Sequence, residues 1–334
     1  MVWVFLPSVL LAEPLRVATY NVDLGRKGPG LMLRDILKPD AQVQAVVAVI
    51  AQVQPDILFL QGVDYDHDLH GLRALRDYIA QAQLVYPHVY AAIPNTGMPT
   101  GVDVDGDGRL GGARDAQGYG WFSGSGGMAL LSRFPIKRDQ VQDLSAILWI
   151  DLPGSNAGKV LVSPAVRSVQ RLSSVGHWVV PVETPGGALT LLGFHATPPV
   201  FDGPEDRNGL RNGDELHLWQ AYLDGAYGQA PQEKFVLLGD ANNDPLQGEG
   251  RKPELMGLLL DPRLQDVEPI SEHYGTATVD WPKTGRFRVD YVLPSQDMRV
   301  LASGVYWPEA ADPMAQTVAQ ASRHRLVWVD LALR

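Results

Sequence analysis

Polar residues follow directly after apolar segments at several points in this 334-residue chain. Carboxylate and amide oxygens are suitable ligands for Mg²⁺ or Mn²⁺, and a histidine beside a carboxylate is suited to acid–base chemistry near neutral pH. Any one of these residues alone is more typical of a cap or a turn, but their recurrence after several segments predicts a shared cleft. The candidates are Asn21, Asp23, Asp64, His195, Asp240, Asn242, Asp290 and His324.

The segments that must position these residues have the patterns of strands and helices. Residues 15–22 and 56–63 are typical of buried strands, and residues 41–56 have apolar side chains at helical spacing. This opening predicts strands joined by a crossover helix. Further strands are predicted over 127–136, 175–183, 188–197, 234–242, 286–295 and 324–333, and further helices over 72–81 and 214–225.

Two long polar segments interrupt this pattern. Residues 94–127 are rich in Gly and Asp and are longer than an ordinary connection, which favours a functional or metal-ordered loop. Residues 198–213 are predicted to form a second polar loop. We find no linker of disordered composition and no tandem repeat in the sequence, so residues 13–334 are predicted to form one domain.

The composition restricts the class of protein. A hydrophobic content of 45% with 20% charged residues is ordinary for a globular enzyme and excludes wholesale disorder. The chain has no cysteine, which excludes disulfides and thiolate metal sites. Its net charge of −10 argues against broad binding to nucleic acid, although bound divalent cations could reverse the local field of a nuclease site.

The first twelve residues, MVWVFLPSVLLA, form a short apolar run that resembles the end of a signal peptide. We therefore expect residues 1–12 to be removed and the protein to be periplasmic or secreted, with a misassigned start or a buried first strand as the alternative. No other stretch reaches about 18 apolar residues, so no membrane span is expected.

Seven motifs occur in order within residues 15–334: TYNVD, DILFLQ, GMALLSRFPI, GFHA, GDANND, RVDYVLPS and SRHRLVWVDL. Their order and spacing resemble those of the endonuclease/exonuclease/phosphatase superfamily. That group includes pancreatic-type deoxyribonucleases, abasic-site endonucleases, neutral sphingomyelinases and inositol phosphatases. The resemblance implies an α/β four-layer sandwich, in which two mixed β-sheets pack face to face with helices outside and the site at one end.

The resemblance also implies roles in a metal-dependent phosphoesterase for the residues that match. Asn21 would contact metal and phosphate, and Asp23 would be an acidic metal ligand. His195 would stabilise the scissile phosphate. Asp240 and Asn242 would position the attacking water and the phosphate oxygens, with Asp240 also close to the metal.

The same resemblance pairs Asp290 with His324 as a carboxylate that orients a terminal histidine. A carboxylate bonded to one imidazole nitrogen fixes the tautomer and raises the basicity of the ring. Hydrolysis of a phosphodiester needs a water held in line, a group that takes its proton, and positive charge near the developing oxyanions. The expected cofactor is Mg²⁺ or Mn²⁺.

Two positions depart from the family pattern. The principal metal ligand of the family is a Glu directly after "LQ", where this chain has Gly62; Asp64 or Asp66 could supply a carboxylate instead. The family motif Ser-Asp-His reads Ser-Arg-His here, so Arg323 replaces a carboxylate. Arg323 could bind substrate phosphate in place of a metal charge, or form a salt bridge with Asp23 or Asp64 in a site that no longer binds metal.

A second motif, DVDGDGRLGGARD, resembles the first half of an EF-hand-type loop. Its twelfth position is Arg114 rather than Glu, so the closing bidentate ligand is missing. We expect a structural Ca²⁺ that orders the long loop, with a solvated acidic loop as the alternative. The expected calcium ligands are Asp103, Asp105, Asp107 and Asp115.

A third cluster, residues 201–215, combines basic and amide side chains with five acidic groups. Because it follows His195, Arg207 or Arg211 could bind a substrate phosphate at the cleft, with a solvated loop as the equal alternative.

Three functions follow as hypotheses. The first is metal-dependent hydrolysis of a phosphodiester or phosphomonoester outside the cytoplasm, by a protein expected to be a monomer. The second is a nuclease that acts on DNA or RNA, which the negative charge does not favour. The third is a catalytically inactive, calcium-stabilised binding module that retains the fold.

Overall fold

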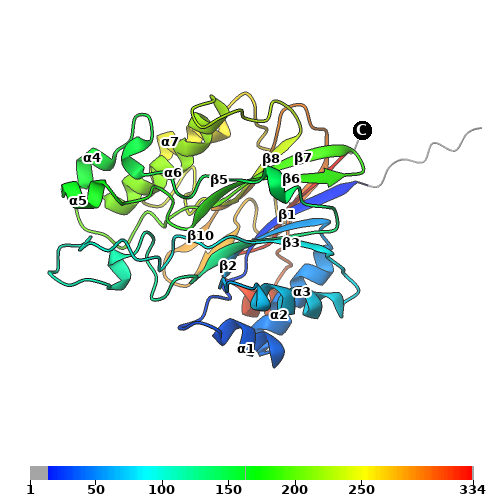
Figure 1. Cartoon of the computed structure of the whole chain (residues 1–334). Helices are drawn as coiled ribbons and strands as arrows, with labels where there is room; N and C mark the ends of the chain where they lie inside the picture. Colours follow the sequence, from blue (N-terminus) through cyan, green and yellow to red (C-terminus); the bar gives the residue numbers. More distant parts are fainter. Residues whose placement is uncertain (1–13, 162, 333–334) are drawn as a thin grey trace, which may run out of the picture.

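Two mixed β-sheets pack face to face in the computed structural model, which describes residues 14–161 and 163–332 (Figure 1). The six-stranded sheet has the order β12 (Val300–Val305), β13 (Val327–Leu331), β1 (Leu15–Asn21), β2 (Ile57–Val63), β4 (Gly127–Ser132) and β3 (His88–Tyr90). The five-stranded sheet has the order β11 (Asp290–Pro294), β8 (Phe235–Asp240), β7 (Gly187–His195), β6 (Gly176–Thr184) and β5 (Gln142–Asp143).

The alternation of side chains along β1 explains why this strand lies inside the sandwich. Val17 packs in the core between the two sheets, whereas Ala18 and Tyr20 face the helices on the other side. Because successive side chains of a strand point to opposite faces, a strand with buried apolar side chains on both faces must be covered on both. The predicted four-layer sandwich is confirmed.

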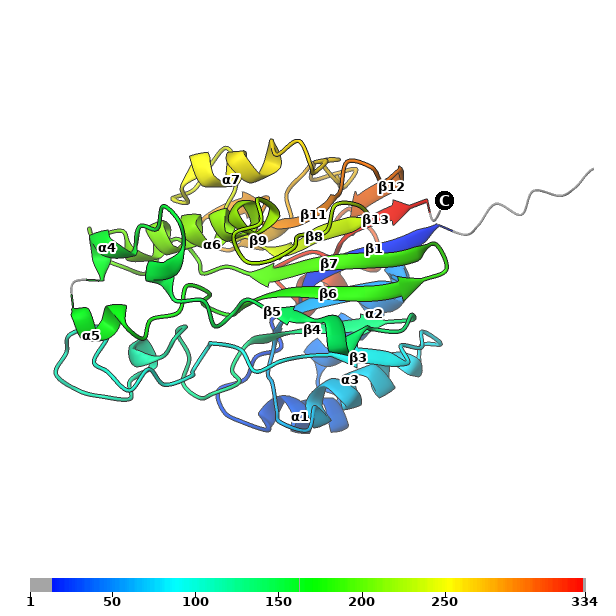
Figure 2. The ribbon, with the colours of Figure 1, turned by 45° about the horizontal axis from the view of Figure 1, so that its top comes forward.

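Helices cover the outer face of each sheet (Figure 2). Those on the six-stranded sheet are α1 (Leu31–Leu37), α2 (Ala41–Val53), α3 (His70–Ala80) and α8 (Ala315–Ala321). Those on the five-stranded sheet are α6 (Arg207–Leu223) and α7 (Lys252–Leu259). Among the described residues, no helix is both long enough and apolar enough to cross a lipid bilayer.

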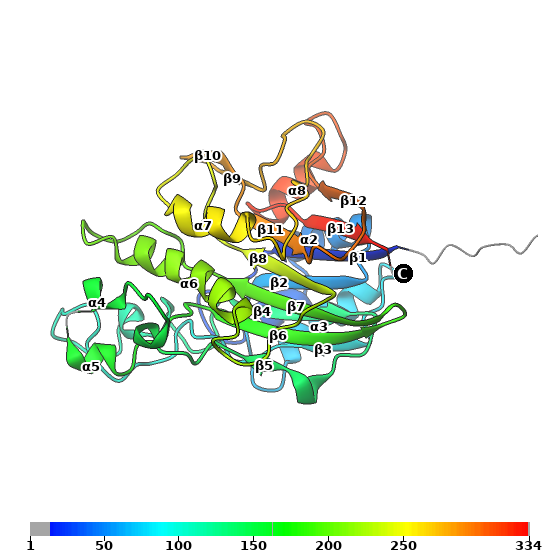
Figure 3. The ribbon, with the colours of Figure 1, turned by 90° about the horizontal axis from the view of Figure 1, so that it is seen from above.

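A lobe extends from one end of the sandwich, away from the chain ends (Figures 1 and 2). It contains α4 (Ala157–Val160) and α5 (Pro164–Arg167), whose apolar residues pack against Trp149 and α6. A short hairpin of β9 (Val279–Trp281) and β10 (Gly285–Phe287) lies outside both sheets (Figure 3).

Three boundaries differ from the sequence-based predictions. The helix that was predicted to begin at residue 214 begins at Arg207. Polar residues before position 214, such as Arg211 and Asn212, are buried against the lobe and continue the helix. The strand predicted over 286–295 divides into β10 and β11, and the last strand begins at Val327 instead of His324. The predicted signal peptide, residues 1–12, lies outside the described residues.

Candidate active site

Strand pairing brings three of the predicted residues into one row. His195 at the end of β7 pairs with Asp240 at the end of parallel strand β8. Asp240 also pairs with Asp290, the first residue of antiparallel strand β11. The pairing register alone therefore gives a His–Asp–Asp row across the end of the five-stranded sheet.

Asp240 is the centre of the candidate site. Its Oδ2 accepts a hydrogen bond of 2.9 Å from Nδ2 of Asn21, which ends β1 in the other sheet. The same oxygen lies 3.4 Å from Nε2 of His195 and 3.9 Å from Nδ1 of His324. Residues from four distant parts of the chain thus meet at one carboxylate, at the end of the sandwich where β1, β7 and β8 terminate.

His324 and Asp290 form a buried pair. The Nδ1 of His324 lies 2.9 Å from Oδ2 of Asp290, and this carboxylate also accepts a hydrogen bond from Oγ1 of Thr278. Burial alone would lower the pKa of His324, but the charges of Asp290 and Asp240 outweigh it and raise the pKa to about 9. His324 therefore holds its proton at neutral pH in the protein without metal.

The backbone before His324 is tied to β1 by one hydroxyl. Ser322 donates a hydrogen bond from its Oγ to the carbonyl of Asn21, and the same Oγ accepts from the backbone N–H of His324. No role was predicted for Ser322 or Thr278 from the sequence. Ser322 lies two residues before His324, but Thr278 lies 12 residues from Asp290, so sequence spacing gave no signal for Thr278.

Asn242 follows Asp240 in a strained turn. Its backbone N–H donates to Oδ1 of Asp240 at 2.8 Å, and its Nδ2 donates to the carbonyl of Ala196 at 3.0 Å. Its φ of 49° lies in the left-handed region, which Asn tolerates better than most residues. This geometry presents the amide of Asn242 beside the residue after His195.

The electrostatics of the site favour a bound cation. Burial and the charge of neighbouring Asp290 raise the pKa of Asp240, while burial lowers the pKa of His195. Ligand atoms of Asp240, Asp290 and His324 all lie within 4.8 Å of one another. Among the described residues, the buried Nδ1 of His195 has no hydrogen-bond partner. Two buried carboxylates close together fit the hard-oxygen preference of Mg²⁺ or Mn²⁺.

Asp23 and Arg323 form an ion pair at the rim of the site. The Nη2 and Nε atoms of Arg323 lie 2.8 and 2.9 Å from Oδ2 of Asp23, and both side chains are partly exposed. The guanidinium therefore neutralises the carboxylate that was predicted to bind metal. Asp23 and Asp64 were the two carboxylates predicted as partners of Arg323, and the structure pairs it with Asp23.

Gly62 replaces the Glu of the family in a backbone conformation that a side chain would not fit. Its φ is 70°, and β2 has an irregularity in its pairing between Gln61 and Val63. A Cβ atom at this position would lie 2.6 Å from Oδ1 of Asn21. The presence of Gly62 in place of Glu therefore removes a predicted metal ligand and also allows a different backbone conformation.

Asp64 and Asp66 accept hydrogen bonds from the backbone. The two oxygens of Asp64 accept from the N–H groups of Arg26 and Gly126, which ties two loops together, and burial raises the pKa of this carboxyl. Asp66 accepts from two N–H groups at the start of α3. Among the described residues, neither belongs to a cluster of three or more metal-ligating side chains.

Arg207 and Arg211, both predicted to bind phosphate, have their contacts within the lobe. Arg211 is buried and donates to backbone carbonyls, including those of Leu172 and Gln117, and burial lowers its pKa to about 10. Arg207 donates to Oε1 of Gln170. The structure does not show either side chain in contact with the Asp240 cluster.

The loop predicted to bind calcium brings three of its four carboxylates together. Ligand atoms of Asp103, Asp105 and Asp115 lie within 4.8 Å of one another. Both oxygens of Asp103 accept from backbone N–H groups within the loop, and Asp107 accepts from Arg109. Asp107 is not among the three clustered residues.

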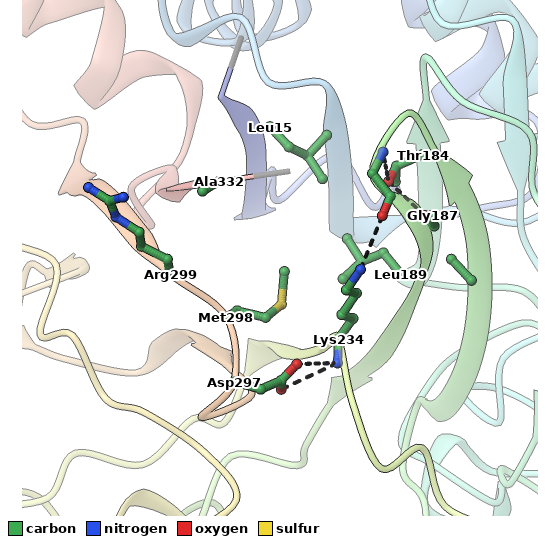
Figure 4. A pocket seen from close by; sticks show the side chains of 11 residues that line it. Leu15, Thr184, Gly187, Leu189, Lys234, Asp297, Met298, Arg299 and Ala332 are labelled. Atoms are coloured by element: carbon green, nitrogen blue, oxygen red, sulfur yellow. Dashed lines mark hydrogen bonds between the residues drawn. The ribbon is translucent and has the colours of Figure 1, made fainter. Parts of the chain in front are cut away.

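A separate cavity lies at the opposite end of the sandwich (Figure 4). Its volume is about 130 Å³, and its lining includes Leu15 at the start of β1 and Met298. Lys234 lines it too and donates from Nζ to the carbonyl of Gly186. None of the residues of the Asp240 cluster lines this cavity.

Comparisons with known proteins bear on the family and the fold of this chain. The sequence profile of the Endonuclease/Exonuclease/phosphatase family matches residues 18–324. A search of curated proteins gives no match. Among solved structures, an endonuclease/exonuclease/phosphatase from Beutenbergia cavernae DSM 12333 has a TM-score of 0.56 at 20% identity, over 96% of this chain and 72% of that one.

Two further structures share the fold. Sphingomyelinase C from Streptomyces griseocarneus has a TM-score of 0.52 at 17% identity, over 95% of this chain and 99% of that one. A beta toxin mutant from Staphylococcus aureus, with bound magnesium ions, has a TM-score of 0.53 at 14% identity, over 95% and 99% of the two chains. From the profile match across nearly its whole length, together with the shared fold, we conclude that this chain belongs to the Endonuclease/Exonuclease/phosphatase family.

Proposed function

We propose that this protein hydrolyses a phosphodiester or phosphomonoester with the help of Mg²⁺ or Mn²⁺. The observation that carries the proposal is the convergence of His195 and His324 on Asp240, at 3.4 and 3.9 Å from its Oδ2. Members of the family are metal-dependent phosphoesterases and nucleases, and this supports a role for the converging residues in phosphoester hydrolysis. The net charge of −10 argues against broad, sequence-independent binding to nucleic acid, which relies on Lys and Arg to neutralise phosphates.

Each residue then has a defined task. Asp240 holds the attacking water and Asn242 a phosphate oxygen, and the hydrogen bond from the backbone N–H of Asn242 to Oδ1 of Asp240 keeps the two residues side by side. His195 contacts the scissile phosphate. His324 donates Nδ1–H to Asp290, which leaves Nε2 to exchange a proton with the reacting groups.

Asn21 and Asp240 are the residues that would hold the metal ion, next to Asp290 and His324. When bound, the ion would supply positive charge to the phosphate oxygens as the oxyanion develops. Arg323 adds a second, fixed positive charge at the rim, and we infer that it binds a substrate phosphate oxygen when its contact with Asp23 is exchanged. Asp23 and Asp64 remain proposed ligands that could approach the ion only after giving up their present partners.

A hydrolysis assay tests the proposal. Purified protein is incubated with bis-p-nitrophenyl phosphate and p-nitrophenyl phosphate in Mg²⁺, Mn²⁺ or Ca²⁺, and separately with plasmid DNA. Turnover of a small ester that is lost in His324→Ala and retained in Lys234→Ala, at the opposite cavity, supports it. Absence of turnover with every metal and substrate contradicts it, and nicking of plasmid with a steep salt dependence favours a nuclease.

We also propose that the Asp103 loop binds a structural Ca²⁺ ion. The clustering of Asp103, Asp105 and Asp115 supports it, since three carboxylates in a Gly-rich loop repel one another unless a cation lies between them. We propose that the protein is periplasmic or secreted and that it is a monomer. This location rests on the apolar run of residues 1–12 and is tested by fractionating cells that express the full chain.

A further inference from the structure

Helix α6 directs two fully buried polar side chains toward the ends of β7 and β8. Asn212 and Glu215 are both 0% exposed and lie one turn apart on this helix. A buried amide or carboxylate destabilises a protein unless its hydrogen bonds are satisfied. The partners of these two side chains therefore show what the helix holds in place.

Asn212 connects the two loops that follow the strands of the candidate site. Its Nδ2 donates to the carbonyl oxygens of Thr197 and Ala241, each at 2.8 Å. Thr197 lies two residues after His195, and Ala241 lies between Asp240 and Asn242. One amide group thus bridges the loop of the candidate phosphate-binding histidine and the loop of the candidate water-positioning pair.

Glu215 and Asn243 fix the orientation of this bridge. Glu215 accepts a hydrogen bond of 2.6 Å from the N–H of Thr197, so Thr197 is held at its N–H by one side chain and at its carbonyl by another. Asn243 donates from Nδ2 to Oδ1 of Asn212 at 3.0 Å, which determines the direction of the Asn212 amide. The bridge is therefore rigid in both position and orientation.

The bridge acts where strand pairing ends. The parallel ladder of β7 and β8 ends at the pair His195–Asp240, followed by one more backbone bond, from the N–H of Ala196 to the carbonyl of Asp240. Beyond this pair, two amide side chains connect the loops: Nδ2 of Asn242 donates to the carbonyl of Ala196, and Nδ2 of Asn212 donates to a carbonyl in each loop. Without Asn212, two buried carbonyls would lose their donor and the separation of the loops would be less strictly defined.

We propose that Asn212 is a positioning residue that holds His195 and Asn242 at the separation the reaction requires. The inference rests on the proposed phosphoester hydrolysis. Asn212 acts through the backbone of its neighbours and does not itself contact substrate. Residues that orient the groups of a metal site typically change activity about 10- to 100-fold when they are altered.

The test compares two buried asparagines of similar bonding. Asn95 is also 0% exposed, and its Nδ2 donates to the carbonyls of Ser145 and Ser173 at 2.7 and 2.8 Å, neither of which belongs to the loops after β7 and β8. Asn212→Asp and Asn95→Asp each remove an amide donor with little change in volume. Both are expected to lower the melting temperature, but only Asn212→Asp is expected to lower kcat by about 10- to 100-fold with little change in KM.

A second measurement does not depend on turnover. The ring ¹⁵N and ¹H signals of His195 are recorded in the full-length, metal-free protein, and they are expected to shift in Asn212→Asp and to remain in place in Asn95→Asp. If Asn212→Asp does not fold, Asn212→Ser retains one donor and is expected to give a smaller loss of kcat in the same direction.

The outcomes separate the two proposals. If the wild type hydrolyses no ester, the proposed function fails, and the signals of His195 still report on positioning. If the wild type is active and Asn212→Asp leaves kcat and the His195 signals unchanged, or if both Asp variants lower kcat equally, the positioning role of Asn212 is wrong.

Discussion

Nδ1 of His324 lies 2.9 Å from Oδ2 of Asp290, and both side chains are buried. This pair raises the pKa of the histidine to about 9 against the opposing effect of its burial, with Asp240 contributing in the same direction. The protonated imidazole is therefore favoured at neutral pH in the metal-free protein. Its charge is compensated by carboxylates on two neighbouring strands.

Replacing Asp290 by Asn should lower the pKa of His324, because the replacement removes the nearest negative charge. The folded-state pKa of about 9 exceeds the value of roughly 6.5 for an unfolded chain. The pair therefore stabilises the fold fully below pH 6.5, and this contribution is lost as pH rises through about 9. Urea denaturation of wild type and Asp290→Asn from pH 6 to 10 measures it. A difference between the two proteins that is the same at every pH would contradict the assignment.

Replacing Arg323 by Ala should weaken substrate binding without destabilising the fold. The pair with Asp23 is partly exposed, and such pairs contribute about 0–1 kcal/mol. We expect KM to rise while the melting temperature changes little. Arg286→Ala, which removes another exposed guanidinium paired with an Asp, is the control. An unchanged KM for the ester in Arg323→Ala would contradict the proposed contact between Arg323 and the substrate phosphate.

Introducing the Glu of the family at Gly62 should destabilise the protein instead of restoring a ligand. A side chain in the left-handed region costs about 1–2 kcal/mol, and the Cβ would also lie 2.6 Å from Oδ1 of Asn21. Gly275 has a φ of 61° but open space around its Cβ, so Gly275→Ala isolates the cost of the backbone conformation. Chemical denaturation should show a larger loss for Gly62→Ala than for Gly275→Ala. Equal losses would mean that the neighbourhood of Asn21 adapts.

His177 should make the protein less stable in acid. Burial lowers its pKa to about 3, with a hydrogen bond to the carbonyl of Glu215 as a smaller opposing effect. Between roughly pH 6.5 and about 3, the unfolded chain binds a proton that the folded protein does not. The free energy of unfolding therefore falls by about 1.4 kcal/mol for each unit by which the pH is lowered in that window. Urea unfolding at pH 7, 6 and 5 gives the slope of the free energy of unfolding against pH for each protein. This slope should be smaller in His177→Gln than in the wild type, and equal slopes would exclude His177 as the cause.

Removal of calcium should lower the melting temperature if the Asp103 loop binds this ion. A ligand that binds only the folded state stabilises it by mass action. Differential scanning calorimetry with and without a chelator is the measurement, and the effect should be absent in Asp115→Asn. Asp297→Asn, at the opposite cavity, should retain it. A chelator effect of the same size in Asp115→Asn would assign the calcium to another place.

Most of the strands and the residues at their ends could be predicted from the sequence, because both depend on local patterns. An apolar run followed by a polar residue marks the end of a buried strand, and this rule identified His195, Asp240 and Asn21. The helix from Arg207 was predicted to begin seven residues too late, since its first turns contain Gly and charged residues. Their burial against the lobe, which no local pattern reports, makes them helical.

The sequence by itself determined the types of chemical group and the order in which they occur along the chain. Only the tertiary structure decided which groups meet. The row His195–Asp240–Asp290 follows from strand pairing between residues far apart in the chain, and the approach of Asn21 follows from the packing of one sheet on the other. The pairing of β1 with β13 within one sheet brings Arg323 close to Asp23, and the packing of α6 against the lobe encloses Arg211 among carbonyls. Long, charged side chains are directed by neighbours that sequence spacing does not specify, whereas strand-end residues are directed by the strands that carry them.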